Sequence, residues 1–283
     1  MDRPGESAPD VWYRELWIEF PDGTKEYFYI ERKATGTHIP LLHEKREPWT
    51  DLNVHKCPCC PLPPAFLSCP AAVSLQTTLG KLRTRHSIEQ VKATAVDARG
   101  RSQTVEWPLP LVGGTLVQLA VFTSDCPVGH RLKPYLVGLT PFVSSLDLSK
   151  HLASKILEKY GGSMEAASQE FKGALEPLPE VFNHLAKRLR AGELDTEVSP
   201  EGRRLSRDAV PNSISTVDAF IQLLALRADR LLGQVSKELG WEGAGSSAGA
   251  SGPAVAPKRT EDGGWLGKLR ESVLGFFRAT PQP

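Results

Sequence analysis

Four of the five cysteines in this chain lie within sixteen residues, in the segment HKCPCCPLPPAFLSCP at positions 55–70. The fifth, Cys126, lies far downstream in TSDCPVGH. Thiolates are the ligands of structural zinc and of iron–sulfur clusters, and paired thiols also carry redox chemistry. The first question is therefore which of these cysteines act together.

Proline residues divide the cysteines into two groups. A proline follows Cys57, Cys60, Cys69 and Cys126, whereas none follows Cys59. Proline stiffens the backbone that carries the thiolate, and a rigid ligand loop loses less entropy when a metal binds. The spacing C-x2-C-x8-C-x56-C suits four thiolates on one metal or cluster. We predict these four cysteines as the ligands and Cys59 as a bystander.

The identity of the bound group stays open at this stage. Zinc is narrowly preferred, because the ligands come from two chain regions that a tetrahedral site would join. A [4Fe-4S] cluster is the alternative, since Cys-Pro steps also recur at cluster ligands. The same thiols could instead be unliganded core residues, or a dithiol redox pair at Cys57/Cys60 or Cys59/Cys60. His55, His130 and Cys59 are further candidates, as replacement ligands or as groups that hydrogen-bond to the ligands.

Composition restricts the partners. The 283 residues include 34 Lys or Arg and 33 Asp or Glu, which gives a net charge of +1. This balance produces no general field for nucleic acid or anionic lipid, so no nucleic-acid partner is expected. The first ten residues do not look like an export signal, and no apolar run approaches the length of a membrane span. We expect a cytoplasmic protein, whose five thiols stay reduced rather than forming a disulfide framework.

Sequence motifs of common enzyme classes are missing. The chain has no G-x-x-x-x-G-K-[ST] loop, no G-x-G-x-x-G turn and no G-x-S-x-G elbow. An enzymatic role would rest on the cysteines alone. Whether the protein is an enzyme is uncertain, and a non-catalytic role is favoured.

The N-terminal part is predicted to contain two β-hairpins. Residues 11–32 alternate apolar and polar side chains around the turn PDGT, and residues 88–107 do the same around Arg99-Gly100. A short helix is predicted over 71–82. The apolar run over 115–123 has no decisive periodicity, and we interpret it as a buried helix.

The C-terminal part is predicted to be helical. One helix carries leucine and isoleucine every four residues and ends at Gly161, and two more flank Pro177 and Pro179. The longest helix is predicted over 215–239, with Ser215 and Asp218 as its capping box. Its apolar stripe favours a bundle helix over a coiled-coil seam, and the oligomeric state stays undetermined.

These elements predict an α+β fold, with N-terminal antiparallel hairpins and a Cys-rich metal-type module followed by an all-helical C-terminal half. The expected organisation is a tail at 1–10, a β-rich mixed region at 11–143 that includes the cysteines, and a helical region at 144–240 packed on it. A Gly/Ala/Ser/Pro linker at 241–264 and an amphipathic helix at 265–279 complete the chain.

The amphipathic helix at 265–279 is predicted to dock on a partner protein, because a flexible tether raises its effective concentration. A membrane surface is less favoured, since Lys258–Pro283 contains five basic and three acidic residues, a weak positive bias. The helix could instead fold back on its own chain. The side chains expected to dock are Trp265, Leu266, Leu269, Val273, Phe276 and Phe277.

At the cysteines the chain resembles an uncharacterised bacterial domain family with a C-P-x-C-P-L-P-P motif, a preceding W-T-x-L and later Cys-Pro steps. The resemblance covers about residues 12–240, implies the same four cysteine ligands and brings no established activity. Two features depart from it: Cys59 occupies a variable position, and YLVGLTPFV is largely apolar where a polar stretch is expected. The matching segments are Trp49–Leu52, Cys57–Pro64, Cys69–Leu75 and Thr123–Pro127, with Leu132 and Pro134.

Together these observations predict a non-catalytic cytoplasmic binding or adaptor protein with a structural four-cysteine metal site and a tethered docking helix. The alternative is an iron–sulfur or dithiol redox sensor that uses the same cysteines.

Overall fold

The computed structural model describes residues 13–29, 46–97, 100–136, 139–192 and 208–241. The chain divides into two units, 1–245 and 246–283. The predicted tail at 1–10, nearly all of the linker and the amphipathic helix with its six docking side chains lie outside the described residues.

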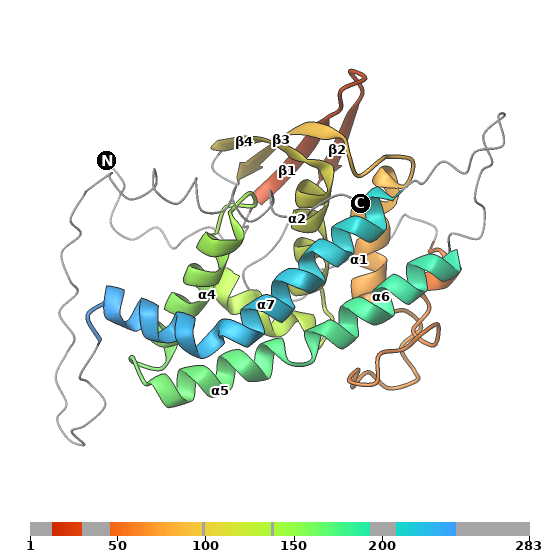
Figure 1. The fold of residues 1–283 in the computed structure, drawn as a ribbon. Helices are drawn as coiled ribbons and strands as arrows, with labels where there is room; N and C mark the ends of the chain where they lie inside the picture. The colour runs from red at the N-terminus through yellow and green to blue at the C-terminus, as the bar shows by residue number, and fades with distance from the viewer. Residues whose placement is uncertain (1–12, 30–45, 98–99, 137–138, 193–207, 242–283) are drawn as a thin grey trace, which may run out of the picture. The chain divides into compact units, whose positions relative to one another are not determined.

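A four-stranded antiparallel sheet is formed by the two predicted hairpins. Its strands are β1 (Tyr13–Glu19), β2 (Lys25–Tyr29), β3 (Gln90–Asp97) and β4 (Ser102–Pro108), in the order β2-β1-β3-β4 (Figure 1). Gly23 and Gly100 occupy the turns with positive φ, a conformation that favours glycine. The buried face of the sheet includes Leu16 and Ile18, as their alternation predicts.

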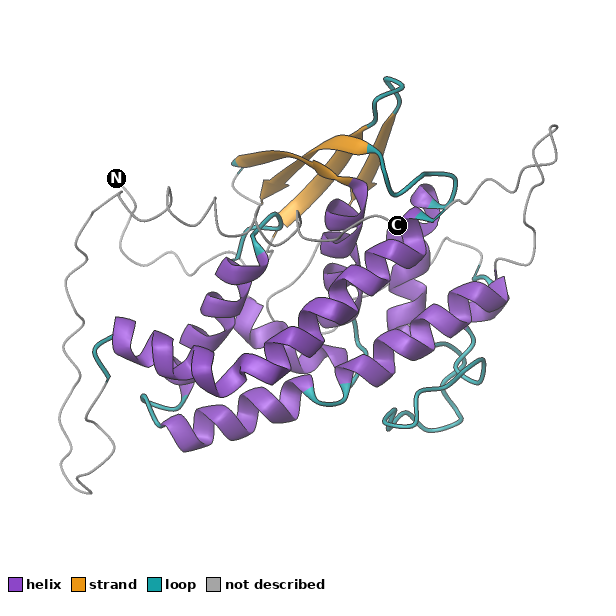
Figure 2. Cartoon of the chain, in the orientation of Figure 1, coloured by secondary structure: helices purple, strands orange, loops and turns teal. Residues whose placement is uncertain are grey.

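Helices make up most of the remaining described chain, which confirms the α+β fold (Figure 2). Short 3₁₀ turns connect several of them: η1 (Pro48–Thr50), η2 (Gly80–Leu82) and η3 (Gly129–Leu132). The helices are α1 (Pro70–Leu79), α2 (Leu109–Phe122), α3 (Lys133–Leu136), α4 (Ser145–Lys159), α5 (Met164–Leu175), α6 (Leu178–Gly192) and α7 (Ala209–Glu238).

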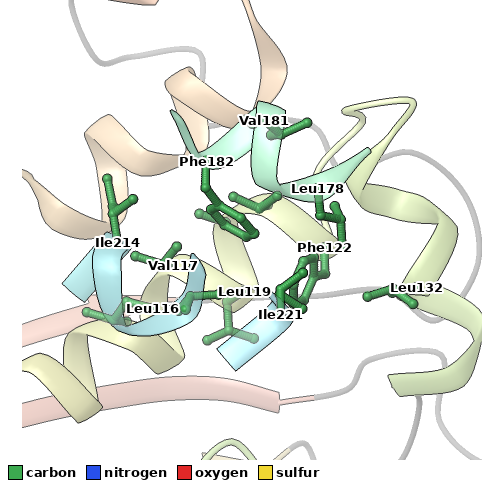
Figure 3. Packing of buried hydrophobic residues seen from close by; sticks show 14 of the residues in the cluster. Leu116, Val117, Leu119, Phe122, Leu132, Leu178, Val181, Phe182, Ile214 and Ile221 are labelled. Atoms are coloured by element: carbon green, nitrogen blue, oxygen red, sulfur yellow. The ribbon is translucent and has the colours of Figure 1, made fainter. Parts of the chain in front are cut away.

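The apolar run after β4 is a buried helix, as predicted, but α2 begins six residues earlier, at Leu109. Its central glycines allow α7 to approach closely, because a Cβ on Gly113 would lie 1.9 Å from Ser213 Oγ. At the other end of α2, Phe122 meets Phe182 of α6 edge-to-face, with ring centroids 6.2 Å apart (Figure 3).

The predicted start of the longest helix is wrong. α7 begins at Ala209, so Ser215 and Asp218 lie inside the helix and form no capping box there. The helix can start early because Pro211 falls in its first turn, where the missing N–H would have no intrahelical partner.

The bundle interpretation of α7 is confirmed, since it packs against α2, α4, α5 and α6. Its buried stripe consists of apolar side chains at helical spacing, namely Val217, Ile221, Leu224, Ala228, Leu232 and Val235. Among the described helices, α7 is the one long and apolar enough to cross a membrane. That is weak evidence for a span, because a core helix has the same composition.

A single hydrophobic cluster joins the sheet, the cysteine segment and the helices. Cys57, Cys69 and Cys126 are part of it, together with residues from every long helix. The cysteines therefore lie within the main core of the described chain.

Candidate metal centre

The cysteine segment is tied at its ends by the η1 turn. The Cys69 N–H donates to the Thr50 carbonyl at 2.8 Å, and the Leu52 N–H donates to the Leu67 carbonyl at 3.0 Å. Asp51 and Ser68 form an isolated antiparallel bridge between these two bonds. The WTDL stretch thus closes the loop that carries the first three predicted ligands.

Inside that loop, the C-P-x-C step forms a closed turn. The Cys60 N–H donates to the Cys57 carbonyl at 3.0 Å, and Lys56 Nζ donates to the Leu62 carbonyl at 2.6 Å. Cys57 is buried, whereas Cys59 and Cys60 are half-buried. The turn places two cysteines of the Cys-Pro set on one short, rigid segment.

Cys69 lies at the start of α1, as the N-cap residue before Pro70. Burial raises the pKa of its thiol, while hydrogen bonds from the backbone N–H groups of Ala72 and Ala71 act in the opposite direction. These N–H groups have no intrahelical partner, since they belong to the first turn of the helix. The position therefore offers two donors to a thiolate.

Cys126 has the same local arrangement in a different part of the fold. It follows α2, and its N–H donates to Ser124 Oγ at 3.3 Å. Burial raises the pKa of its thiol to about 11, while the backbone N–H groups of Gly129 and Val128 again favour the thiolate. At both cysteines, the donors are the second and third residues after the cysteine.

The structure gathers all five cysteines into one neighbourhood. Burial is the main reason that the pKa of Cys57 rises to about 12, and the next causes are the charges of Cys69, Cys59, Cys126 and Cys60. Among the described residues, no three His, Cys, Asp or Glu side chains are close enough to hold a single metal ion in this arrangement. The thiols are thus neighbours, but the described side chains form no preassembled site for one ion.

A buried arginine lies beside these thiols. Arg188 of α6 is fully buried, and its guanidinium donates to the carbonyls of Trp49 at 3.1 Å, Asp51 and Leu52 at 2.9 Å. Among the described residues, its Nε has no hydrogen-bond partner. The positive charge of Arg188 also lowers the pKa of Cys69, against the larger effect of burial.

The three remaining candidates occupy peripheral positions. Cys59 Sγ donates to the Pro177 carbonyl at 3.8 Å, which points it toward α6. The exposed His130 ring has Nδ1 2.8 Å from the Cys126 carbonyl oxygen, a hydrogen bond when that nitrogen is protonated. His55 is also exposed, with φ of 46°, and its carbonyl lies 3.0 Å from Nδ1 of His184. His130 thus contacts the backbone of a predicted ligand, whereas the backbone of His55 contacts His184 of α6.

The chemistry of these donors suits a metal–thiolate group, although the described side chains form no preassembled metal site. Buried sulfur donors suit zinc and iron–sulfur clusters, and N–H groups directed at the sulfur stabilise its charged form. The orphaned Nε of a buried cation is consistent with a nearby negative charge.

Sequence reasoning missed Arg188, although a signal was present. Position 188 follows Val181 by seven residues and Leu185 by three, so it falls on the apolar face of α6. A charged residue at such a position is rarely buried without a specific partner. The partners, however, come from a loop that precedes it by more than a hundred residues.

A model of the domain of unknown function DUF6901 matches residues 12–230. The chain therefore belongs to this family. No curated protein matches the sequence, and no solved structure matches it either.

Proposed function

We propose that this member of the DUF6901 family is a non-catalytic binding protein whose fold is held by a four-thiolate metal centre at Cys57, Cys60, Cys69 and Cys126. The observation that carries the proposal is that these four cysteines, from segments up to 69 residues apart, lie in one neighbourhood together with Cys59, and that three of the four are buried. The matching pairs of N–H donors at Cys69 and Cys126 add support, because they favour thiolates.

Zinc is the metal we propose first. It has no redox chemistry, and structural sites with four cysteine ligands contribute directly to folding. At this position the ion would join the loop before α1 to the end of α2. The prolines that follow each ligand limit the freedom that the loop loses on binding.

The test is the metal content of the purified full-length chain and of five single Cys→Ser variants. Cys57→Ser, Cys60→Ser, Cys69→Ser and Cys126→Ser are expected to lose the metal or bind it much more weakly. Cys59→Ser is the matched control, since it makes the same change beside two ligands and is expected to keep the metal. A metal-free wild type, or loss in Cys59→Ser but not in Cys126→Ser, would refute the ligand assignment.

A second candidate is an iron–sulfur or dithiol redox protein built on the same cysteines. Its support is that all five thiols, Cys59 included, lie in one neighbourhood, so more than one pair of them could act together. The cysteine sulfurs around a four-iron cluster lie farther apart than those around a single zinc ion, whose bonds to sulfur are about 2.3 Å. A brown, visibly absorbing protein after anaerobic purification would select the cluster, and a colourless protein with stoichiometric zinc would select the structural site.

The proposal includes a partner protein that binds the amphipathic segment at 265–279. A flexible tether would raise the effective concentration of even a weak docking helix. The apolar side chains of this segment would fill a groove on the partner. We also retain the cytoplasm as the proposed location, where free thiols remain available for metal binding.

A further inference from the structure

We propose that Arg188 is a positioning residue of the thiolate centre, which holds the η1 turn in place and offsets the negative charge of the ligands. This inference rests on the proposed function, because it assigns a role toward the metal site. It concerns a residue on α6 that contributes no ligand atom and lies far from the cysteines in the sequence.

The environment of Arg188 is unusual for a cation. The side chain is 0% exposed, yet its acceptors are three neutral backbone carbonyls, at Trp49, Asp51 and Leu52. Within the described part of the chain, no carboxylate forms an ion pair with it, and its Nε remains without a partner. Because a buried charge is costly without an opposite charge, the site needs an anionic group nearby.

The thiolate centre is a suitable anionic group. Four thiolates around a divalent ion leave a net charge of about −2, which a nearby guanidinium reduces to about −1. Arg188 lies close to this centre, because two of its carbonyl acceptors flank Thr50, whose own carbonyl binds the Cys69 N–H. Binding of the metal and burial of Arg188 therefore stabilise each other.

The hydrogen bonds of Arg188 also fix the position of a predicted ligand. The carbonyls that it binds flank Thr50, whose own carbonyl accepts from the Cys69 N–H at 2.8 Å. The contact between α6 and η1 is tight, because a Cβ on Gly192 would lie 2.6 Å from Trp49 Cδ1. A displaced guanidinium would thus release the turn that aligns Cys69.

The experiment measures zinc affinity by competition with a chromophoric chelator, on full-length variants whose folding is checked by circular dichroism. Arg188→Met removes the charge and all the hydrogen bonds, whereas Arg188→Lys keeps the charge but not the planar fork of donors. Arg188→Gln keeps an amide donor without the charge. It tests the effect of losing the charge if Arg188→Met does not fold. Arg190→Met is the matched control, since it makes the same change at an exposed position of the same helix.

We expect Arg188→Met and Arg188→Gln to bind zinc about 10- to 100-fold more weakly than the wild type, the range found when groups that support metal ligands are lost. The zinc affinity of Arg188→Lys should lie between theirs and that of the wild type. The zinc affinity of Arg190→Met should equal that of the wild type. If the bound group is an iron–sulfur cluster, the charge-removing variants should lower its reduction potential.

Two results would overturn the inference. Folded Arg188→Met or Arg188→Gln with the affinity of Arg190→Met would remove the role of Arg188 while leaving the metal centre intact. Equal affinities for Arg188→Lys and Arg188→Met would reject charge compensation. A wild type that binds neither zinc nor iron would instead refute the proposed function itself, so the two failures are distinguishable.

Discussion

At the scale of single residues, the sequence indicates candidate ligands, whereas the contacts around them become visible only in the fold. The proline after Cys57, Cys60, Cys69 and Cys126 selects a ligand set that stays a prediction, because the fold brings all five cysteines, Cys59 included, into one neighbourhood. Proline restricts the backbone locally, so its effect on a cysteine can be predicted from the adjacent residue in the sequence. Arg188 was not predicted, because its role depends on carbonyls that only the folded chain places beside it.

A local network at the first hairpin turn makes a prediction about pH. Asp22 accepts hydrogen bonds from Thr24 Oγ1 at 2.6 Å and from Arg85 Nη1 at 2.7 Å, and these two contacts, that of Thr24 first, lower its pKa to about 2. A lowered carboxyl pKa stabilises the folded state above the ordinary value of 3.8, and this contribution is lost as the pH falls toward 2.

We expect carbon-detected NMR to show Asp22 of the folded chain titrating near pH 2. In Thr24→Val the side-chain donor is lost, so the pKa should move toward its ordinary value. An Asp22 carboxyl that titrates near 3.8 in the wild type would contradict the observed hydrogen bonds.

At the scale of elements, the hairpins and most helices follow from periodicity and turn residues, while helix starts do not. α7 begins at Ala209 rather than at Ser215, because Pro211 is compatible with a first turn. α2 begins at Leu109, before a glycine pair that weakens helix propensity on its own. Packing against α7 compensates for that weakness, and such a contact is invisible in a single sequence.

The crossing of α2 and α7 can be tested with two alanine substitutions. Gly113→Ala places a Cβ 1.9 Å from Ser213 Oγ, so it should lower the free energy of unfolding by roughly 1–3 kcal/mol. Gly233→Ala is the control within α7, where nothing lies within 4 Å of the new Cβ. It should be neutral or stabilising by up to about 1 kcal/mol.

Urea denaturation of the two full-length variants measures both effects. Equal stability of Gly113→Ala and Gly233→Ala would contradict the close contact described between α2 at Gly113 and α7 at Ser213.

At the scale of the whole molecule, one hydrophobic cluster unites the β-rich and helical regions of the described chain. The cysteine segment belongs to this cluster through Cys57 and Cys69. A metal centre at this place would therefore support the main core, as the proposed structural role requires.

Deletion of residues 257–283 tests the proposed docking segment. We expect the melting temperature to stay nearly unchanged, because the core described above is formed by residues that precede the deletion. Binding of the partner protein should be abolished. A large drop in melting temperature would instead mean that this segment supports the fold of its own chain.

The central claim is that four cysteine sulfurs surround one metal centre, and X-ray absorption at the metal edge of the purified full-length protein tests it most directly. For zinc, the account predicts four sulfur neighbours at about 2.3 Å and no nitrogen or oxygen ligand. For iron, it predicts sulfur neighbours together with iron–iron scattering, the signature of a cluster. A first shell dominated by nitrogen or oxygen, or a protein that carries no metal, would contradict it.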